Sequence, residues 1–184
     1  MIYVLQIQTG KETEVCASLK HIGIKAYAPC ERIIIRKGGL WTKMLKLLFP
    51  GYVFTDIEYS AEMFHRIKPI SGVIRFLGSP TPLPEHEAEM ISWLANGGEV
   101  IEPSEAVVDE NGSIIGFKGF LNGCEDKIRY VNRRQKKALI AVRFDGKLHK
   151  ANISFDFPDK EKAEERSDRV DSFPYPKSAV HRDF

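Results

Sequence analysis

The sequence predicts an α+β protein in two parts: an antiparallel sheet covered by helices, followed by a small β-barrel. Two observations support this. In the first half, segments that alternate like strands are separated by segments with a helical period. In the second half, short β-rich segments follow one another between turn residues, which is typical of a small closed barrel. A chain of 184 residues has room for two such domains.

The first part follows the order strand, helix, hairpin, helix, strand, helix. We expect a strand over 2–8, a helix over 11–22, a hairpin with strands over 33–35 and 45–54, a helix over 59–67, a strand over 73–77 and a helix after Pro84. Gly23 closes the first helix, and Gly38-Gly39 supplies the hairpin turn. These elements form a predicted first domain over residues 1–98.

A polar segment containing Gly and Pro predicts a linker over residues 99–108. Short strands are then expected over 113–117, 127–131, 138–144 and 147–155. Asp145-Gly146 between the last two is a type I′ hairpin signal. The predicted barrel domain spans residues 109–158, and residues 159–184 form a C-terminal tail.

Composition argues against several classes of protein. Cys16, Cys30 and Cys124 are far apart and odd in number, with no CxxC pair, which disfavours a disulfide framework and a tetrahedral zinc site. We expect no metal and no cofactor. The N-terminus lacks the pattern of a signal peptide, and no apolar run approaches the about 20 residues of a membrane helix. We therefore expect a cytoplasmic monomer that does not associate with membranes.

Catalytic motifs are absent from the sequence. His86-Glu87 begins like a zinc protease motif, but Met90 stands where the second histidine should be. There is no GxSxG, no Walker loop and no GxGxxG, and the five histidines are scattered. We expect no catalytic residues and predict that the protein is not an enzyme.

Positive charge is concentrated in one short module, although the formal net charge of the chain is only +2. Residues 118–150 contain ten lysines and arginines but three acidic residues. Such a concentration favours binding to a polyanion, and nucleic acid is the first candidate.

Three motifs carry a resemblance to a known family. The N-terminal IYVLQIQTGKE, the segment LFPGYVF over residues 48–54 and GVIRFLG over residues 72–78 occur in the order and spacing of the NusG family of transcription elongation factors. The likeness extends over residues 2–95. It implies that the predicted sheet with helices is of the NusG N-terminal type.

In that family the N-terminal domain binds the clamp helices of RNA polymerase through an apolar hollow. By resemblance, Phe49, Tyr52 and Phe54 would line this hollow here. Independently of the family, Pro50-Gly51 interrupts a strand so that aromatic side chains can face outward, and desolvated aromatic groups commonly anchor protein interfaces. The alternative for each of the three is packing in the core.

The second part resembles the KOW domain of the same family, an SH3-like barrel. Its motif departs from the family pattern, because Asp126 stands where a glycine is usual and Gly123 lies three positions earlier. This departure indicates a specialised paralogue. Together with the basic barrel, it resembles the LoaP branch of antiterminators, which is thought to recognise an RNA hairpin in the nascent leader.

The expected RNA-binding residues surround a turn at residues 132–135. Cations would contact phosphates, while aromatic and amide groups would stack on or hydrogen-bond to exposed bases. The candidates are Lys127, Arg129, Tyr130, Asn132, Arg133, Arg134, Lys136 and Lys137. The alternative is a solvated basic face.

A further basic group flanks the first-domain hairpin and is a candidate contact for upstream DNA through Arg36, Lys37 and Lys43. A solvated arm is the alternative. The sequence therefore predicts a transcription elongation and antitermination factor that binds the polymerase clamp and a nascent RNA hairpin. Two alternatives stay open: a housekeeping NusG-like factor whose KOW domain binds Rho or the ribosome, and a KOW-containing ribosome-associated protein.

Overall fold

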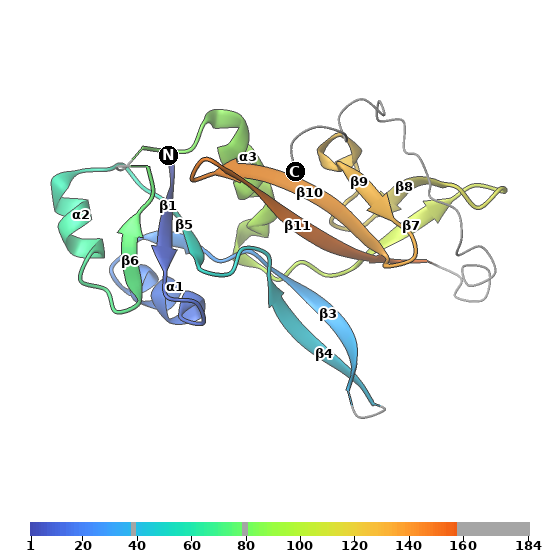
Figure 1. Cartoon of the computed structure of the whole chain (residues 1–184), viewed down its shortest axis with the longest axis horizontal. Coiled ribbons are helices and arrows are strands. Elements are labelled where there is room, and N and C mark those ends of the chain that lie inside the picture. Colours follow the sequence, from blue (N-terminus) through green and yellow to red (C-terminus); the bar gives the residue numbers. More distant parts are fainter. Residues whose placement is uncertain (38–39, 79–80, 158–184) are drawn as a thin grey trace. The chain divides into compact units, whose positions relative to one another are not determined.

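The protein folds into two compact units, seen in the computed structural model of Figure 1. The structure describes residues 1–37, 40–78 and 81–157, without the side chains of residues 36–41. Unit 1 comprises Met1–Ile101 and Val142–Ala151, and unit 2 comprises Glu102–Ala141 and the chain from Asn152 onward. The predicted α+β class is confirmed. The expected tail over residues 159–184 lies outside the described residues.

Unit 1 is built on a four-stranded sheet with the order β2-β5-β1-β6. Its elements are β1 (Ile2–Ile7), α1 (Glu12–His21), β2 (Lys25–Tyr27), β3 (Cys30–Lys37), β4 (Leu40–Leu47), β5 (Tyr52–Asp56), α2 (Ala61–Ile67), β6 (Val73–Phe76) and α3 (Glu85–Leu94). Each predicted strand and helix is present here within a few residues of its expected bounds, except the second hairpin strand. Gly23, with φ of +80°, follows α1 as expected.

The second hairpin strand, expected over 45–54, is divided. β4 ends at Leu47, and β5 begins at Tyr52 after a turn through Pro50 and Gly51. Proline has no N–H for a ladder, and Gly51 adopts a φ of +85° that other residues rarely adopt. The turn therefore separates the β3–β4 hairpin from the sheet, while β5 pairs with β1 and β2 inside it.

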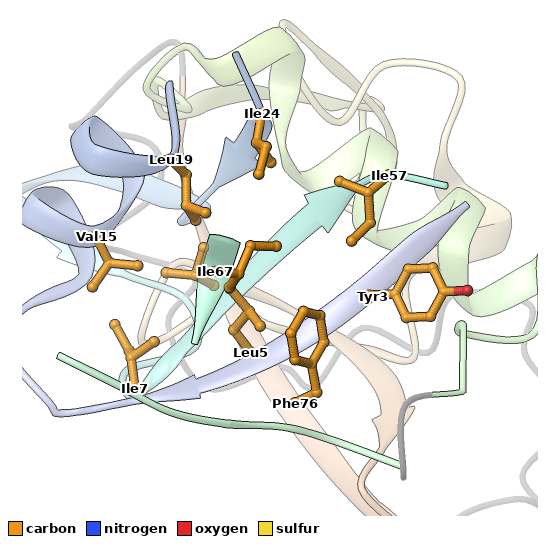
Figure 2. Packing of buried hydrophobic residues seen from close by; sticks show 10 residues of the cluster. Tyr3, Leu5, Ile7, Val15, Leu19, Ile24, Ile57, Ile67 and Phe76 are labelled. Atoms are coloured by element: carbon orange, nitrogen blue, oxygen red, sulfur yellow. The ribbon is translucent and has the colours of Figure 1, made fainter. Parts of the chain in front are cut away.

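The main core of unit 1 lies between the sheet and helices α1 and α2 (Figure 2). Leu5 of β1, Val15 and Leu19 of α1 and Ile67 of α2 are completely buried. Each such side chain stabilises the fold by about 1.5–3 kcal/mol through burial. Val4 is also buried, at 3% exposed, although alternation places it on the opposite face of β1. The central strand is therefore covered on both faces.

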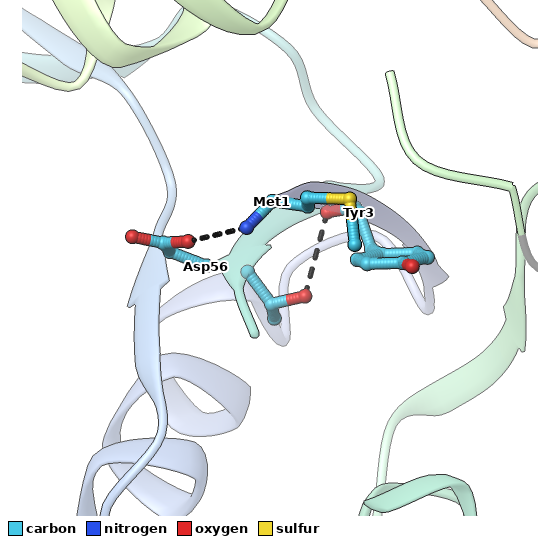
Figure 3. Close-up of polar contacts among 4 residues, drawn as sticks. Met1, Tyr3 and Asp56 are labelled. Atoms are coloured by element: carbon cyan, nitrogen blue, oxygen red, sulfur yellow. Dashed lines mark hydrogen bonds and ion pairs between the residues drawn. The ribbon is translucent and has the colours of Figure 1, made fainter. Parts of the chain in front are cut away.

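Polar contacts tie the start of β1 to β5 (Figure 3). The N-terminal ammonium of Met1 lies 3.0 Å from Oδ1 of Asp56, and Thr55 Oγ1 donates a 3.4 Å hydrogen bond to the carbonyl of Tyr3. Because both partners of the ion pair are largely exposed, it contributes at most about 1 kcal/mol. The pairing of Ile2 with Asp56 brings these groups together.

The β3–β4 hairpin is a separate two-stranded ribbon that extends away from the four-stranded sheet of unit 1 (Figure 1). Its register runs from Cys30 opposite Leu47 to Lys37 opposite Leu40. The expected Gly38-Gly39 turn lies outside the described residues. At its base, Glu31 forms a parallel bridge with Ile101.

The second half forms a curled five-stranded sheet with the order β8-β7-β11-β10-β9. The strands are β7 (Ser104–Val108), β8 (Ile114–Lys118), β9 (Tyr130–Asn132), β10 (Lys137–Phe144) and β11 (Lys147–Asp156). Asp145 and Gly146 both have positive φ, of 53° and 67°, as a type I′ turn requires. The turn signal in the sequence is therefore confirmed.

Two segments differ from their expected structure. Strand β7 and the bridge at Ile101 occupy most of the expected 99–108 linker, because Ser104, Ala106 and the residues between them alternate as in a half-buried strand. The expected strand over 127–131 is shorter, since Glu125–Lys127 forms a 3-10 turn before β9. Strand β7 was not predicted because Pro103 and the polar residues around it are typical of a linker.

Candidate functional site

The candidate interface is an aromatic cluster formed by Phe49, Tyr52 and Phe54. Phe54 pairs with Val4 and so lies on the face of the sheet opposite the main core. The rings of Phe49 and Phe54 meet edge to face with their centroids 5.6 Å apart. The structure thus brings the predicted polymerase-binding residues together.

A buried carboxylate holds the turn that carries this cluster. Oε1 of Glu12 accepts a 2.8 Å hydrogen bond from the N–H of Gly51, and Oε2 accepts one of 2.8 Å from the N–H of Gly10. The carbonyl of Gly51 in turn accepts a 2.9 Å bond from the N–H of Ile7. Sequence reasoning missed Glu12, whose only signal was an acidic residue at the start of a helix, two positions after Gly10.

The aromatic cluster is not exposed in this structure. Phe49 and Phe54 are 4% and 0% exposed, and Tyr52 is half-buried. Residues 142–151 of unit 1, which we call the hairpin tip, supply much of the cover. The ring centroid of Phe144 in the tip lies 5.6 Å from that of Phe49, 5.0 Å from that of Tyr52 and 5.5 Å from that of Phe54. The expectation that these aromatic side chains face outward is therefore not met here.

His149 completes the cover. Its ring stacks on that of Phe144, with centroids 3.6 Å apart and planes 2° from parallel, and its centroid lies 5.2 Å from that of Tyr52. Nε2 of His149 is buried and has no hydrogen-bond partner among the described residues. Burial lowers the pKa of His149, while a hydrogen bond to the backbone of Phe144 opposes this shift. The neutral imidazole is therefore favoured in this site.

A polar contact fixes the hairpin tip beside the rings. Oε2 of Glu87, in α3, accepts a 2.9 Å hydrogen bond from the backbone N–H of Arg143, and Oε1 lies 3.2 Å from Nε2 of His86. Nη2 of Arg75 lies 4.0 Å from Oδ2 of Asp145. The sequence motif His86-Glu87 was considered only as an incomplete metal site, and nothing in the sequence predicted this role.

The predicted RNA-binding residues divide into two groups. Arg129, Tyr130 and Arg134 are exposed on and beside β9, and Tyr130 is 41% exposed. Asn132 instead caps the turn, because its Oδ1 accepts a 2.9 Å hydrogen bond from the N–H of Gln135. Exposed aromatic and guanidinium groups suit contact with a single-stranded nucleic acid.

The remaining cations make contacts inside unit 2. Arg133 is only 9% exposed: it donates a hydrogen bond to the carbonyl of Gly112, and its guanidinium lies 5.1 Å from the ring centroid of Phe157. In this structure Arg133 therefore has a packing role, and its contact with RNA stays a prediction. The three lysines of the group also have partners: Lys127 pairs with Asp126, Lys136 with Asp156, and Lys137 donates a hydrogen bond to Ser154.

On the β3–β4 hairpin, Lys43 is exposed beside two exposed apolar residues, Ile34 and Leu45. Ile34 pairs directly with Lys43, so both lie on one face of the ribbon. The side chains of the other two candidate DNA contacts, Arg36 and Lys37, lie outside the described residues.

The three cysteines are free. Burial, assisted by the charge of Glu12, raises the pKa of Cys16 to about 11, so this group stays a thiol at neutral pH. Across residues 1–37, 40–78 and 81–157, no cluster of three or more His, Cys, Asp or Glu side chains is arranged to hold a metal ion. In the same part of the chain no helix is long and apolar enough to span a membrane.

Comparisons with known proteins agree on one family. Residues 2–92 match the family model described as transcription termination factor nusG. The transcription termination/antitermination protein NusG of Escherichia coli K12 is 26% identical over 181 residues, which cover 88% of this chain and 95% of that protein. NusG of Pseudomonas aeruginosa is 25% identical over 173 residues, covering 83% and 94% of the two chains.

Among solved structures, one reporting domain interaction in Thermotoga maritima NusG aligns with a TM-score of 0.46 and 22% identity, over 83% of this chain and 92% of that one. The family model matches the part of the chain that carries the aromatic cluster, and the relatives align along most of both sequences. The chain is therefore similar to the NusG family of transcription factors.

Proposed function

We propose that this protein is a transcription elongation and antitermination factor that binds the clamp helices of RNA polymerase through the aromatic cluster and nascent RNA through unit 2. The observation that carries the proposal is the cluster itself. Three aromatic side chains from a turn and one strand are gathered on the sheet face opposite the main core, in the region that matches the family model.

Polymerase binding follows from the chemistry of this surface. Large aromatic side chains that become fully desolvated commonly dominate the binding energy of protein interfaces. The turn at Gly51 is held by Glu12 and by the backbone of Ile7, so the rings are positioned before a partner arrives. An amphipathic pair of helices would fit such a surface with little reorganisation of the turn.

The polymerase half is tested with Tyr52→Asp. A carboxylate in the cluster would have to be desolvated against apolar helices, so binding to core RNA polymerase should be lost. The measurement is co-elution of the full chain with polymerase, and Tyr130→Asp is the matched control on β9. Undiminished binding by a folded Tyr52→Asp variant would refute the assigned surface.

RNA binding rests on the exposed group around β9. Arg129, Tyr130 and Arg134 offer two cations and a stacking surface, which suits a hairpin loop better than a regular duplex. We propose that this surface recruits the factor to chosen transcripts, as in a specialised antiterminator resembling LoaP. The exposed Lys43 of the β3–β4 hairpin is a candidate contact for upstream DNA.

The RNA half is tested by filter binding of the full chain to hairpin RNA over a salt series. Replacing Arg129 and Arg134 by alanine should weaken binding and make its logarithmic salt dependence shallower by about two, because two phosphate contacts are lost. Lys118→Ala is the matched control, since Lys118 is an exposed cation of the same sheet paired with Glu105. Equal affinity and slope in both variants would contradict the RNA surface.

One observation favours a second candidate, in which unit 2 binds a protein such as Rho or a ribosomal component. Ile115 on β8 is 63% exposed, and an exposed aliphatic side chain on a strand is a plausible contact for another protein. Capture of such a partner by the wild-type chain but not by Ile115→Ser would support this alternative. Added hairpin RNA should then change neither result.

A further inference from the structure

Arg75 lies in the same row of the sheet as a member of the aromatic cluster. Arg75 of β6 pairs with Gln6 of β1, and on its other side Gln6 pairs with Tyr52 of β5. Residues that pair directly across antiparallel strands project from the same face of the sheet. Because neighbouring strands lie about 4.8 Å apart, Arg75 stands about 10 Å from Tyr52. An arginine on the edge strand therefore borders the apolar surface.

A side-chain hydrogen bond orients the Arg75 guanidinium. Nε of Arg75 donates a 2.8 Å hydrogen bond to Oε1 of Gln6, which is half-buried in the middle of the row. Because the guanidinium is planar, a bond at Nε directs the outer Nη1 and Nη2 groups away from Gln6. The arginine side chain is 57% exposed, so its outer donors are accessible. The fork is therefore oriented before a partner arrives.

A carboxylate already lies near this fork, at a distance too long for a hydrogen bond. Oδ2 of Asp145 is 4.0 Å from Nη2 of Arg75, whereas N–H···O hydrogen bonds measure about 2.7–3.2 Å. The position of Asp145 is set by its own turn, in which it is followed by Gly146. The fork therefore attracts a carboxylate and still has donors for one that comes closer.

The surroundings of Arg75 favour a carboxylate of a protein helix over the phosphate of a nucleic acid. An arginine fork can hold either group by two parallel hydrogen bonds. The neighbouring surface of Tyr52 and Phe54 is aromatic, however, and such a surface suits the apolar stripe of an amphipathic helix. Polar residues of such a helix flank its apolar stripe, where they would meet the edge strand.

We infer that Arg75 is a specificity-determining residue of the polymerase-binding surface, and that it binds an aspartate or glutamate of the helix that packs on the aromatic cluster. This inference rests on the proposed function. Two turns of a helix span about 11 Å, close to the separation of Tyr52 and Arg75. The acidic residue is therefore expected about seven positions from the apolar residue that contacts Tyr52. Gln6 is a positioning residue, because it acts through Arg75.

The experiment measures binding of full-length variants to core RNA polymerase at low and at high salt. Arg75→Ala should lower the affinity by about tenfold at low salt and by less at high salt, because salt screens an exposed ion pair. Arg75→Lys keeps the charge without the fork and should recover only part of the affinity. Gln6→Leu should lower the affinity by about two- to threefold, because the fork is no longer oriented. Lys20→Ala is the matched control, an exposed cation on α1 whose loss should change nothing.

Charge exchange identifies the partner group. Arg75→Glu should bind more weakly than Arg75→Ala, because like charges repel, and arginine in place of the matching acidic residue of the clamp helices should restore the affinity. The loss in Arg75→Ala should also persist in an Asp145→Asn background. That change removes the nearby carboxylate and keeps a residue suited to the turn.

The outcomes separate this inference from the proposed function. Unchanged or higher polymerase affinity in Arg75→Ala, with binding still lost in Tyr52→Asp, would overturn the role of Arg75 and leave the proposed surface standing. Loss of duplex DNA binding in Arg75→Ala, without a change in polymerase affinity, would assign the fork to phosphate and also overturn it. If polymerase binding survives both Tyr52→Asp and Arg75→Ala, the proposed surface falls with the inference. Circular dichroism confirms that each variant is folded.

Discussion

At the residue scale, Glu12 shows how one buried carboxylate holds the turn that carries the aromatic cluster. It is 2% exposed and satisfies the backbone N–H groups of Gly10 and Gly51. Buried carboxylates are rare unless paired or hydrogen-bonded, and here the two backbone donors supply the compensation. The position of the aromatic cluster therefore depends on Glu12, which lies in α1 and outside the cluster.

Replacing Glu12 by alanine should lower the free energy of unfolding by about 1–3 kcal/mol or more, because two backbone donors lose a charged acceptor. Urea denaturation of the full chain measures this change. Glu14→Ala is the control: Glu14 is exposed and pairs only with Lys11 at the surface, so its loss should cost at most about 0.5 kcal/mol. Equal destabilisation by the two changes would show that the Glu12 hydrogen bonds contribute little.

His149 makes the packing of the hairpin tip depend on pH. Burial lowers its pKa below the ordinary value of 6.5, with opposing contributions from the backbone of Phe144 and from Asp145, and a smaller lowering from Lys147. The imidazole binds a proton more readily when its surroundings open to water, so the packing of the tip stabilises the fold fully above pH 6.5 and less as the pH falls below that value. The other charged groups facing the tip are Glu87 with His86, and Arg75 beside Asp145.

We therefore expect the amide of Arg143 to lose protection between pH 7.5 and pH 5.5, after correction for intrinsic exchange. His149→Phe should keep the stacking on Phe144 and abolish the pH dependence, because the titrating group is gone. The comparison separates His149 from His86, which remains in the variant. A persistent pH dependence in His149→Phe would assign the effect to another group.

Arg133 and Arg134 are neighbours in sequence with opposite environments. Arg133→Ala should lower the melting temperature by several degrees, since it removes a buried hydrogen bond to Gly112 and the cation–π contact with Phe157, together worth about 1–3 kcal/mol. Arg134→Ala should leave the melting temperature unchanged and weaken binding to RNA. Thermal unfolding followed by circular dichroism, together with filter binding, measures both effects. A stable Arg133→Ala protein with lost RNA affinity would reverse these two roles.

At the element scale, the β3–β4 hairpin separates from the sheet because Pro50 and Gly51 end one strand and start another. On the hairpin, Ile34 and Leu45 are 54% and 57% exposed beside Lys43. A ribbon that exposes apolar and basic side chains on one face is suited to contact with another molecule.

Lys43→Ala should weaken binding of the full chain to duplex DNA without changing its affinity for hairpin RNA, because Lys43 and the exposed RNA candidates lie in different units. Electrophoretic mobility shift at low salt measures the change, since phosphate contacts are strongest there. Thr42→Ala is the matched control: Thr42 is the neighbouring exposed residue and lies on the opposite face. The same loss in both variants would argue against a face-specific DNA contact.

Local signals predicted individual elements well where backbone geometry is set by a few residues. Asp145-Gly146 predicted its turn, and Gly23 predicted the end of α1, since each supplies positive φ at low cost. Strand β7 was missed because Pro103 and neighbouring polar residues resemble a linker. Its strand structure depends on pairing with β8 and β11, which no local pattern contains.

At the scale of the whole molecule, three motifs over residues 2–78 sufficed to predict the family, and the family model matches residues 2–92. Sequence analysis also named all three members of the aromatic cluster. It could not assign Glu87, His149 or Phe144 to that surface, because the residues that meet there are separated by up to about a hundred positions along the chain. Contacts at such separations leave no periodic signal in a single sequence.

By itself, the sequence determined most of the strands and helices, the hairpin turn at Asp145-Gly146, the concentration of positive charge and the NusG-family motifs. These depend on residue type and local spacing, which a sequence displays directly. Only the tertiary structure decided that Arg133 is buried while Arg134 is exposed, that Glu12 holds the turn at Gly51, and that Phe144 and His149 cover the aromatic cluster. Burial and long-range contact are properties of the packed chain, because they depend on which distant segments exclude water from one another.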